Sequence, residues 1–442
     1  MDRIKITIAY LLLGIMLASC NLPSQDSLPN VVLEDLPQET TVIPDLTNAT
    51  PEQGSALATS EMEQPAPEFE LPTPEPPGDL IPGQDRMRAV DELTIDQIAM
   101  IDANVGWAIG GADGRADSIF RSVDGGQSWE EVSPPEPIDN DQTQKAAGGF
   151  LDASSAWIVY HLESDPRPGA SHPLRVWYTS DAGQQWRLSS PVSLEFIGSL
   201  HSPAWVHFNN QEQGWILARY GGSGMHRYPV YMVRSEDAGA YWTILEDPYE
   251  GLWLQSCPKT GWDWHASGTG VVTVGFCPFE SAEIHLTTDA GTTWETIRLP
   301  FSPGEEERFG NASCEAHSPI LFSDQELLLA SECPIWGDDP ETIHLLYRTR
   351  DLGRTWQIQD YPGGQLYNIG KDVILAMGRD LYRSEDGGLT WTLIKQVAWD
   401  GQFSFIDAQS GWAVARDEAD IALVRTVDGG TTWQLIEPIL IP

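Results

Sequence analysis

The feature that most constrains this chain is an eight-residue pattern, Ser/Thr-x-Asp-x-Gly-x-x-Trp, that occurs seven times. Its copies begin at Ser122, Thr179, Ser235, Thr287, Thr349, Ser384 and Thr426. Repetition at intervals of tens of residues is typical of propellers, solenoids and related architectures. We therefore expect seven equivalent structural units, and we call each copy of the pattern a box.

The residue types of the box fit a tight turn between two strands. An Asp carboxylate can accept hydrogen bonds from the N–H groups that follow it, and Gly adopts positive φ without a Cβ clash. Strand-like alternation precedes the box, as in Asp380–Ser384 and Ala422–Thr426. We assign a structural role to the Asp and the Trp of each box: Asp124, Trp129, Asp181, Trp186, Asp237, Trp242, Asp289, Trp294, Asp351, Trp356, Asp386, Trp391, Asp428 and Trp433.

The spacing of the boxes predicts the size of each unit. Successive boxes begin 57, 56, 52, 62, 35 and 42 residues apart, lengths that suit one four-stranded blade each. The last blade shows the plan most clearly, with strands A to D expected at 403–406, 411–416, 421–426 and 432–437. The sequence therefore predicts an all-β, seven-bladed propeller of four-stranded antiparallel blades over residues 86–442.

A second repeat marks the turn between strands A and B. It reads Asp102–Trp107, Asp152–Trp157, Asn209–Trp215, which is one residue longer, and Asp407–Trp412. Blades 4, 5 and 6 lack its Gly-Trp pair and are expected to diverge. How the ring closes is left open by the sequence.

A family resemblance is carried by the last blade. Gly411-Trp412-Ala413-Val414, followed by Arg425 and the box Thr426-Val427-Asp428-Gly429-Gly430-Thr431-Thr432-Trp433, resembles the Asp-box (BNR-type) propellers, especially the photosystem II assembly and stability factors. The resemblance covers about residues 90–440 and implies the propeller fold. Because the same boxes occur in sialidases, xyloglucanases and sortilin-type receptors, it is compatible with several functions.

The first 85 residues have the composition of a signal and a tether. Arg3 and Lys5 precede an apolar run that ends at Cys20, and residues 1–20 resemble a bacterial lipoprotein signal peptide in which Cys20 becomes lipidated. An uncleaved anchor with an incidental Cys is the alternative. Residues 21–85 contain no Lys, Arg or His and are rich in Pro and Glu, so we expect a disordered acidic tether. These features predict a chain anchored by lipid at the bacterial cell envelope, outside the cytoplasm.

The net charge of −40 excludes nucleic acid as a favoured partner, because phosphate binding needs Lys and Arg. It equally disfavours docking of the propeller itself on anionic lipid. Solubility of an exported protein explains the charge, and attraction of a basic partner or of divalent cations is the alternative. No cofactor motif is present, and no cofactor is expected.

The four cysteines beyond Cys20 are expected to form two disulfides. Cys257 and Cys277 lie at equal distances from a turn-like stretch near residue 267, and Cys314 and Cys333 from one near residues 323–324. Residues equidistant from a hairpin turn face each other across two strands. Metal binding is the competing interpretation; no CxxC spacing supports it, and no metal site is predicted.

The long connections between strands B and C and between D and A offer the expected binding face, opposite the box turns. Aromatic and polar residues gather in them, and as a set they suggest recognition of a protein or a sugar. The candidate binding residues are His161, Tyr220, His226, Tyr228, Trp253 and Trp336.

No catalytic constellation stands out in the sequence. The Arg-Ile-Pro signature of sialidases is absent, and the acidic clusters at 305–307, 338–339 and 417–418 are interpreted as loop charge rather than as glycosidase carboxylates. We therefore assign no catalytic residue. The leading hypothesis is a lipid-anchored, non-catalytic protein-binding or assembly module. The alternative is a carbohydrate-active protein, either a sialidase- or xyloglucanase-like glycoside hydrolase or a lectin, that uses the variable-loop face.

Overall fold

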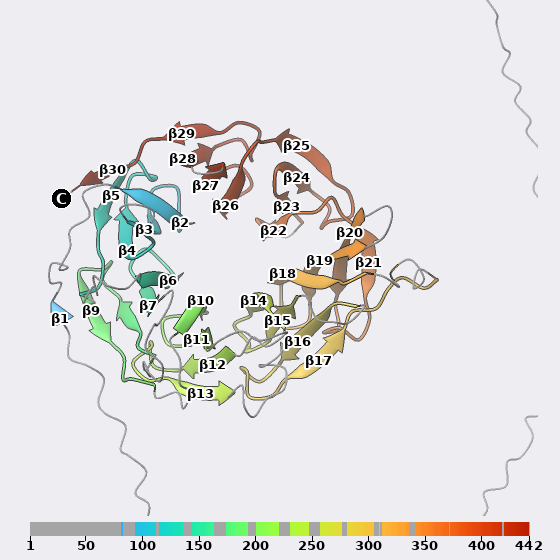
Figure 1. Ribbon diagram of the computed structural model, residues 1–442, viewed down its shortest axis with the longest axis horizontal. Helices are drawn as coiled ribbons and strands as arrows, with labels where there is room; N and C mark the ends of the chain where they lie inside the picture. The colour runs from blue at the N-terminus through green and yellow to red at the C-terminus, as the bar shows by residue number, and fades with distance from the viewer. Residues whose placement is uncertain are drawn as a thin grey trace, which may run out of the picture. The chain divides into compact units, whose positions relative to one another are not determined.

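The chain forms a ring of seven antiparallel β-sheets around a central axis, as the computed structural model shows (Figure 1). The structure describes residues 81–82, 93–111, 115–135, 144–162, 174–192, 200–220, 230–246, 257–275, 281–304, 309, 312–335, 341–370, 372–417 and 420–441, all within the unit Glu70–Pro442. Every regular element among them is a strand. The predicted seven-bladed propeller is confirmed.

Each blade contains strands A to D in chain order, with A nearest the axis. Blade 1 comprises β2 (Thr94–Met100), β3 (Gly106–Gly111), β4 (Ser118–Ser122) and β5 (Ser128–Glu131). Blade 2 comprises β6 (Gln144–Phe150), β7 (Ala156–Leu162), β8 (Trp177–Thr179) and β9 (Gln185–Leu188). Blade 3 comprises β10 (Leu200–Phe208), β11 (Gly214–Tyr220), β12 (Val230–Ser235) and β13 (Thr243–Glu246). Blade 4 comprises β14 (Lys259–Trp264), β15 (Gly270–Val274), β16 (Glu283–Thr287) and β17 (Glu295–Arg298). Blade 5 comprises β18 (Glu315–Leu321), β19 (Leu327–Ile335), β20 (Glu341–Thr349) and β21 (Gln357–Asp360). Blade 6 comprises β22 (Gln365–Asn368), β23 (Ile374–Met377), β24 (Asp380–Ser384) and β25 (Thr392–Gln396). Blade 7 comprises β26 (Asp400–Phe405), β27 (Gly411–Asp417), β28 (Asp420–Thr426) and β29 (Gln434–Ile436).

The ring is closed by a strand that the sequence did not predict. Beyond blade 7, β30 (Ile439–Ile441) adds to the outer edge of blade 1, where it pairs with β5 in parallel (Figure 1). Leu440 lies opposite Trp129 in this pair. At the opposite end of the described chain, β1 (Ile81–Pro82) pairs with β9 of blade 2, inside the segment that we expected to be a tether. The remainder of that segment, and Cys20, lie outside the described residues.

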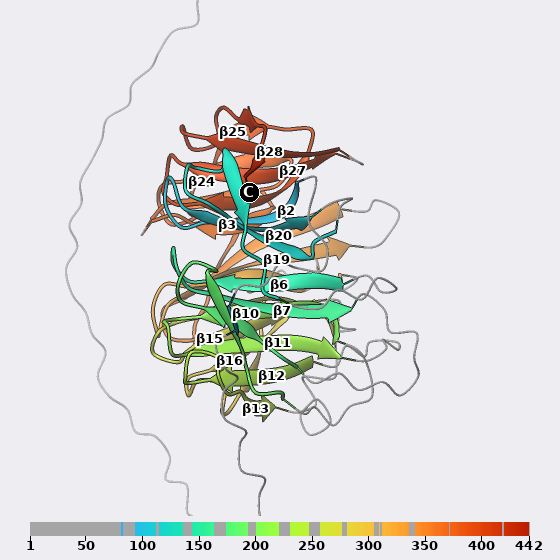
Figure 2. The same ribbon diagram turned by 90° about the vertical axis from the view of Figure 1, so that its left-hand side faces the viewer.

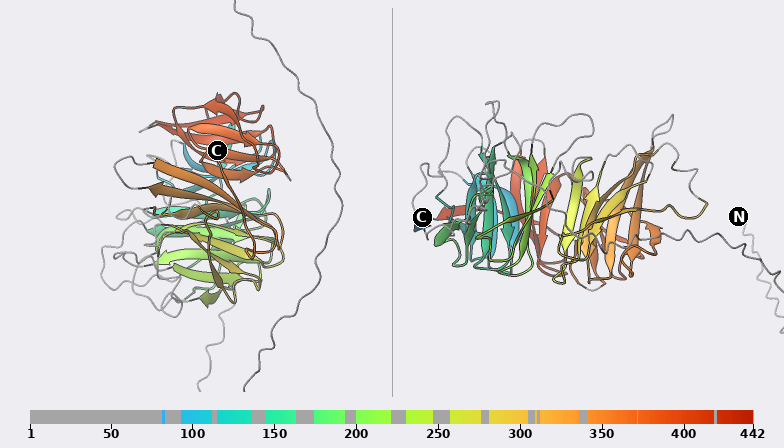
Figure 3. Two further views of the ribbon diagram at one scale, coloured as in Figure 1. Left: turned by 90° about the vertical axis from the view of Figure 1, so that its right-hand side faces the viewer. Right: turned by 90° about the horizontal axis from the view of Figure 1, so that it is seen from below.

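The box turns and the A–B turns lie together on one face of the ring, which we call the box face. In every blade the fourth residue of the box donates its N–H to a carbonyl of the A–B turn, at 2.8 to 3.1 Å. The pairs are Gly125 with Asn104, Ala182 with Ser154, Ala238 with Glu212, Ala290 with Gly268, Leu352 with Gln325, Gly387 with Asp372, and Gly429 with Gln409. Seen from the side, the strands run from this face to the opposite one (Figures 2 and 3).

Within a box, the Asp carboxylate and the first hydroxyl organise the turn. In box 1, Asp124 Oδ1 accepts hydrogen bonds from Ser122 Oγ and from the N–H of Ser128, while Ser122 Oγ accepts from the N–H of Gly126. Gly125 and Gly126 both adopt positive φ, at 78° and 89°. Ala, Leu or Gly fills the first of these positions in the seven boxes, whereas the second is always Gly.

The A–B turn repeat joins neighbouring blades through its Trp. The indole N–H of Trp107 donates to Asp152 O, that of Trp157 to Ala238 O, that of Trp215 to Ala290 O, and that of Trp412 to Gly125 O, each in the next blade. The extra residue of the blade 3 repeat has a clear role, because Asn210 rather than Asn209 caps that turn. In blades 4, 5 and 6 the equivalent positions hold Val271, Leu328 and Leu375.

One of the two predicted disulfides is present in the described residues. Cys314 and Cys333 are bonded, with their Cα atoms 4.1 Å apart. Cys257 is also disulfide-bonded and buried, but its predicted partner Cys277 lies outside the described residues. In the part of the chain that the structure describes, no helix has the length and apolarity needed to cross a membrane.

Candidate functional site

A pocket of about 580 Å³ opens on the central channel, between the inner strands of blades 3 to 6. Its lining comes from β10, β14, β18, β19 and β22: Trp205, Thr260, Gly261, Trp262, Glu315, His317, Ser318, Pro319, Glu332, Gly364, Gln365 and Leu366. Glu315 begins strand A of blade 5, and Glu332 is near the end of strand B. Since the A–B turn is on the box face, both glutamates lie toward the opposite, variable-loop face.

Two glutamates form the chemical centre of this channel pocket. Glu315 and Glu332 are direct cross-strand partners on β18 and β19, so their side chains share one face of the sheet. His344 on β20 lies opposite Glu332 in the next pair, which extends the row by one strand. Cross-strand partners have Cβ atoms about 4.5–5.5 Å apart. The register therefore brings two carboxylates and an imidazole together.

The surroundings shift the pKa values of the two glutamates in opposite directions. Burial raises the pKa of Glu315, and the negative charge of Glu332 raises it further. Glu315 Oε2 is buried and has no hydrogen-bond partner among the described atoms. Contact with His344 lowers the pKa of Glu332 against the effect of burial, with a contribution from His317. The pair is thus biased toward one protonated and one ionised carboxyl group.

Two histidines lie close to the Glu332 carboxylate. Its Oε1 lies 3.4 Å from His344 Nδ1, close enough for attraction but without the alignment of a hydrogen bond, and 3.9 Å from His317 Nε2. Burial lowers the pKa of His317, Glu332 opposes that shift, and His344 reinforces it. His317 is therefore largely neutral near pH 7, and His344 is the closer partner of the Glu332 carboxylate.

A tyrosine completes the polar cluster. The hydroxyl of Tyr361 lies 3.4 Å from His317 Nε2 and donates to Gly364 O at 3.2 Å. Burial raises the pKa of Tyr361, and Glu332 adds to the effect. Tyr361 therefore keeps its proton and serves as a hydrogen-bond donor.

A β-bulge shapes the floor of the pocket. The register of β18 shifts between His317 and Ile320, and Ser318 there adopts a φ of 48°. Positive φ is costly for a residue with a Cβ atom and tends to occur at functional sites. The bulge turns Ser318 and Pro319 into the pocket lining beside His317.

Two indoles provide an aromatic wall. Trp205 on β10 and Trp262 on β14 are partly buried, and their ring centroids lie 5.9 Å apart at an interplanar angle of 39°. Flat rings of this kind combine an apolar face with little loss of conformational entropy on binding. The channel pocket therefore pairs an aromatic surface with a carboxyl pair. Among the described residues, no group of His, Cys, Asp and Glu is arranged to hold a metal ion.

Of the candidate binding residues from the sequence, only His161 has a described side chain, and it does not line this pocket. His161 is only 4% exposed and lies in the interior of blade 2. Tyr220 ends β11, and only its backbone is described. His226, Tyr228, Trp253 and Trp336 lie outside the described residues, as do the acidic clusters at 305–307 and 338–339.

Sequence reasoning missed Glu315 and Glu332, although a usable signal was present. Each is the chain neighbour of a paired cysteine, Cys314 or Cys333. The symmetry that predicted the disulfide also predicts that the two glutamates face each other. His317, His344 and Tyr361 carry no comparable signal, because their meeting depends on the bulge and on the connection to blade 6.

Comparisons with known proteins support the fold. No protein-family model and no curated protein matches the chain. Among solved structures it is similar to the polysaccharide lyase Uly1, with 11% identity, 78% of this chain and 91% of that chain covered, and a TM-score of 0.50. It also matches an ulvan lyase, with 12% identity, 79% and 95% coverage and a TM-score of 0.44. A xyloglucanase from Xanthomonas campestris matches at 13% identity, 77% and 72% coverage and a TM-score of 0.28.

At these identities the similarities show a shared fold, and the two lower TM-scores carry no argument. The leading functional prediction from the sequence, a non-catalytic protein-binding or assembly module, is nevertheless contradicted, because the similar structure Uly1 is a polysaccharide lyase. The prediction relied on the absence of a catalytic motif in the sequence. A carboxyl pair assembled by strand register leaves no such motif.

Proposed function

We propose that this protein is a carbohydrate-active enzyme that cleaves glycosidic bonds in the channel pocket. The observation that carries the proposal is the cross-strand pair Glu315 and Glu332, whose pKa values are shifted in opposite directions. Glycoside hydrolases use one carboxylic acid and one carboxylate, and oppositely shifted pKa values identify the two roles. The lyase fold similarity and the Trp205–Trp262 wall support a saccharide substrate.

The proposed reaction proceeds in two steps. Glu315 gives its proton to the glycosidic oxygen, and that oxygen leaves while Glu332 bonds to the anomeric carbon. Water then attacks this carbon, gives a proton to Glu315 and releases Glu332. A separation of about 5–5.5 Å between carboxyl groups is typical of such retaining enzymes. A directly opposed pair on neighbouring strands suits it, so we expect retention of anomeric configuration.

Substitution of each glutamate tests the proposal. The full chain is assayed on a polysaccharide panel for release of reducing ends, with E315Q and E332Q as test variants. E283Q is the matched control, because Glu283 is partly buried like the two test residues and forms an ion pair with Arg298 outside the pocket. We expect turnover to fall by about 1000-fold or more in both test variants and to persist in the control. Activity that survives both substitutions refutes the proposal.

A lyase reaction is a second candidate because of Tyr361, His317 and Glu315, whose pKa burial raises. In this reaction Glu315 donates a hydrogen bond to the carboxylate of a uronate, and His317 takes the proton from the carbon beside that carboxylate. Tyr361, 3.4 Å from His317, protonates the departing glycosidic oxygen as its bond to carbon breaks. The products distinguish the two reactions. Elimination yields an unsaturated sugar that absorbs ultraviolet light, whereas hydrolysis incorporates one oxygen from water.

We also propose a family and a cellular location for this protein. The seven boxes support membership of the Asp-box propellers, and the Cys314–Cys333 disulfide supports an oxidising compartment. We assign the protein to the outer side of a bacterial envelope membrane, held by lipid on Cys20. The C20S variant is expected to lose the lipid and to leave the membrane fraction; a membrane-bound C20S protein contradicts this assignment.

A further inference from the structure

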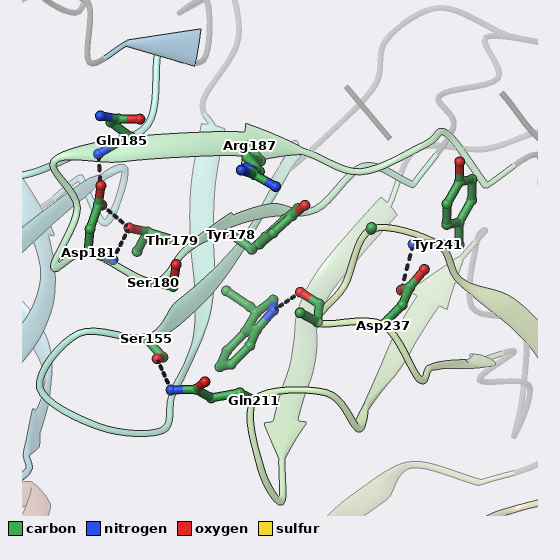
Figure 4. A pocket seen from close by; sticks show the side chains of 13 residues that line it. Ser155, Tyr178, Thr179, Ser180, Asp181, Gln185, Arg187, Gln211, Asp237 and Tyr241 are labelled. Carbon is green, nitrogen blue, oxygen red and sulfur yellow. Dashed lines mark hydrogen bonds between the residues drawn. The ribbon is translucent and has the colours of Figure 1, made fainter. Parts of the chain in front are cut away.

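A second pocket, of about 560 Å³, lies between blades 2 and 3 on the box face (Figure 4). Its lining includes the box aspartates Asp181 and Asp237, the aromatic residues Tyr178 and Tyr241, and Arg187. Pockets of this size hold small ligands. In the view of Figure 4, Tyr178 and Arg187 lie between the two aspartates. None of these residues belongs to the channel pocket.

The boxes of blades 2 and 3 differ from the others at their seventh residue. In boxes 1, 4, 5, 6 and 7 this residue is Ser or Thr, and its hydroxyl donates to the second carboxylate oxygen of the box Asp at 2.6 to 2.7 Å. In boxes 2 and 3 it is Gln185 or Tyr241, and only their backbone N–H groups bond to the Asp, at Oδ1. Among described residues, Oδ2 of Asp181 and of Asp237 accepts no hydrogen bond.

The two boxes with an open carboxylate oxygen are thus the two that line the pocket. Arg187 also lines it, is exposed, and makes no hydrogen bond or ion pair to any described residue. Between the blades, Gln211 Nε2 reaches Ser155 Oγ at 3.5 Å, and the indole N–H of Trp157 donates to Ala238 O at 2.7 Å. These bonds fix the two walls of the pocket relative to each other.

From this lining we infer a non-catalytic saccharide-binding site that takes a neutral sugar unit. Hydroxyl groups of a sugar can donate to the open oxygens of Asp181 and Asp237 and accept from Arg187, while the partly exposed ring of Tyr241 provides an apolar face. Two carboxylates beside one guanidinium, on a chain of net charge −40, disfavour an anionic ligand. Resting on the proposed function, we take the ligand to be part of the polysaccharide substrate, which this site would bind on the box face.

Binding is measured in the E315Q background, so that the result does not depend on turnover. Isothermal titration uses a panel of neutral oligosaccharides, with an oligouronate and a polyamine as competing chemistries. The test variants are Q185T, which supplies the missing hydroxyl to Asp181, and R187M. T432Q is the matched control, because it opens the same Asp oxygen in box 7, away from this pocket.

A neutral oligosaccharide is expected to bind, with affinity about tenfold lower in each test variant, the effect of losing one hydrogen bond to a charged group. T432Q and the channel variant W262A should retain the affinity of this site. Absence of neutral-sugar binding, preference for the polyamine or the oligouronate, or equal affinity in the test variants overturns the inference. Binding that persists when W262A alters the channel wall separates this site from the proposed catalytic one.

Discussion

Glu315 and Glu332 face each other across β18 and β19, and the disulfide between Cys314 and Cys333 joins the same two strands one residue away. A bond placed there fixes the distance between the two backbones at the carboxyl pair. The cross-link therefore constrains the chemistry of the channel pocket as well as the stability of blade 5.

Removal of this disulfide is expected to weaken both stability and activity. In the C314S/C333S variant, the free energy of unfolding should fall by about 3 kcal/mol, because the closed loop gains entropy in the unfolded chain. Turnover should fall at a temperature where the variant remains folded, since the carboxyl pair loses its anchor. Urea unfolding and steady-state kinetics provide the two measurements. Full activity in the folded variant would show that strand pairing alone positions the glutamates.

Gly275 lies against the carboxyl group of Glu315. A Cβ atom at this position would be 2.7 Å from Glu315 Oε2 and 2.6 Å from Thr260 Cγ2. The G275A variant should displace the carboxyl group and reduce kcat about tenfold or more, an effect typical of misplacing a catalytic group. G370A is the control, because the nearest atom to a Cβ at Gly370 is Val373 Cβ, at an ordinary contact distance of 3.9 Å. Equal kinetics in both variants would argue against Glu315.

The activity of the wild-type protein should have a bell-shaped dependence on pH. Glu332 must be ionised, so activity is lost as the pH falls through its lowered pKa. Glu315 must be protonated, so activity is lost as the pH rises through its raised pKa. Profiles of kcat/KM between pH 3 and 9, roughly the range in which carboxyl groups of this kind titrate, measure both limbs. A flat profile contradicts the assigned roles.

The raised pKa of Glu315 also has a consequence for stability. A carboxyl group whose pKa is higher in the folded state lowers stability as the pH rises from its unfolded value through the folded one. The E315Q variant cannot ionise and escapes this loss. Its urea midpoint should exceed that of the wild type at pH 8 but not at pH 4, where both side chains are neutral. The opposite ranking would mean that Glu315 is ionised without penalty.

The seventh residue of a box should contribute measurably to stability. Ser128 Oγ donates to Asp124 Oδ2 at 2.6 Å, and the S128A variant should lose about 1 kcal/mol of unfolding free energy. The reciprocal change, Q185S, supplies a hydroxyl that box 2 lacks and should leave stability equal or higher. Thermal unfolding of the two variants makes the comparison. A stabilised S128A protein would contradict the role of the hydroxyl.

Closure of the ring can be tested at Leu440, which packs on the cluster that contains Trp129. The L440A variant should lose about 2 kcal/mol, at the lower end of values for removing a packed Leu side chain. L435A is the control, since Leu435 on β29 is 64% exposed. Chemical denaturation should separate the two variants, and an equal effect would indicate that β30 adds little to the ring.

The fold could be predicted from the sequence because its information is local and repeated. The box encodes its own turn, and strands β27 and β28 end at or within one residue of their predicted bounds. Strands A and D of blade 7 were predicted less accurately: the predictions of 403–406 and 432–437 compare with Asp400–Phe405 and Gln434–Ile436. Closure by β30 was missed, because a three-residue strand that pairs far along the chain leaves no local pattern.

The candidate site could be predicted only in part. The variable-loop side was expected to carry function, and the channel pocket lies toward that side, but its residues belong to strands instead of loops. The spacing of Cys314 and Cys333 predicts that their neighbours Glu315 and Glu332 also pair across the two strands. The protonation bias of that pair depends on burial and on His344 from a third strand, information that appears only when the sheet is assembled.

The joint between blades 4 and 5 is built differently from those that an indole bridges. Val271 occupies the position where other blades carry the bridging Trp, and the bonds occur at the inner strands: Asp263 accepts from the N–H of Leu321 at 2.7 Å, and Thr260 donates to Ala316 O. Trp262 and Glu315 therefore stand on two sheets that are locked edge to edge at the channel. In the proposed reaction, Trp262 contacts the polysaccharide and Glu315 takes part in its cleavage. The two hydrogen bonds between their blades would keep these residues at a fixed separation during the reaction.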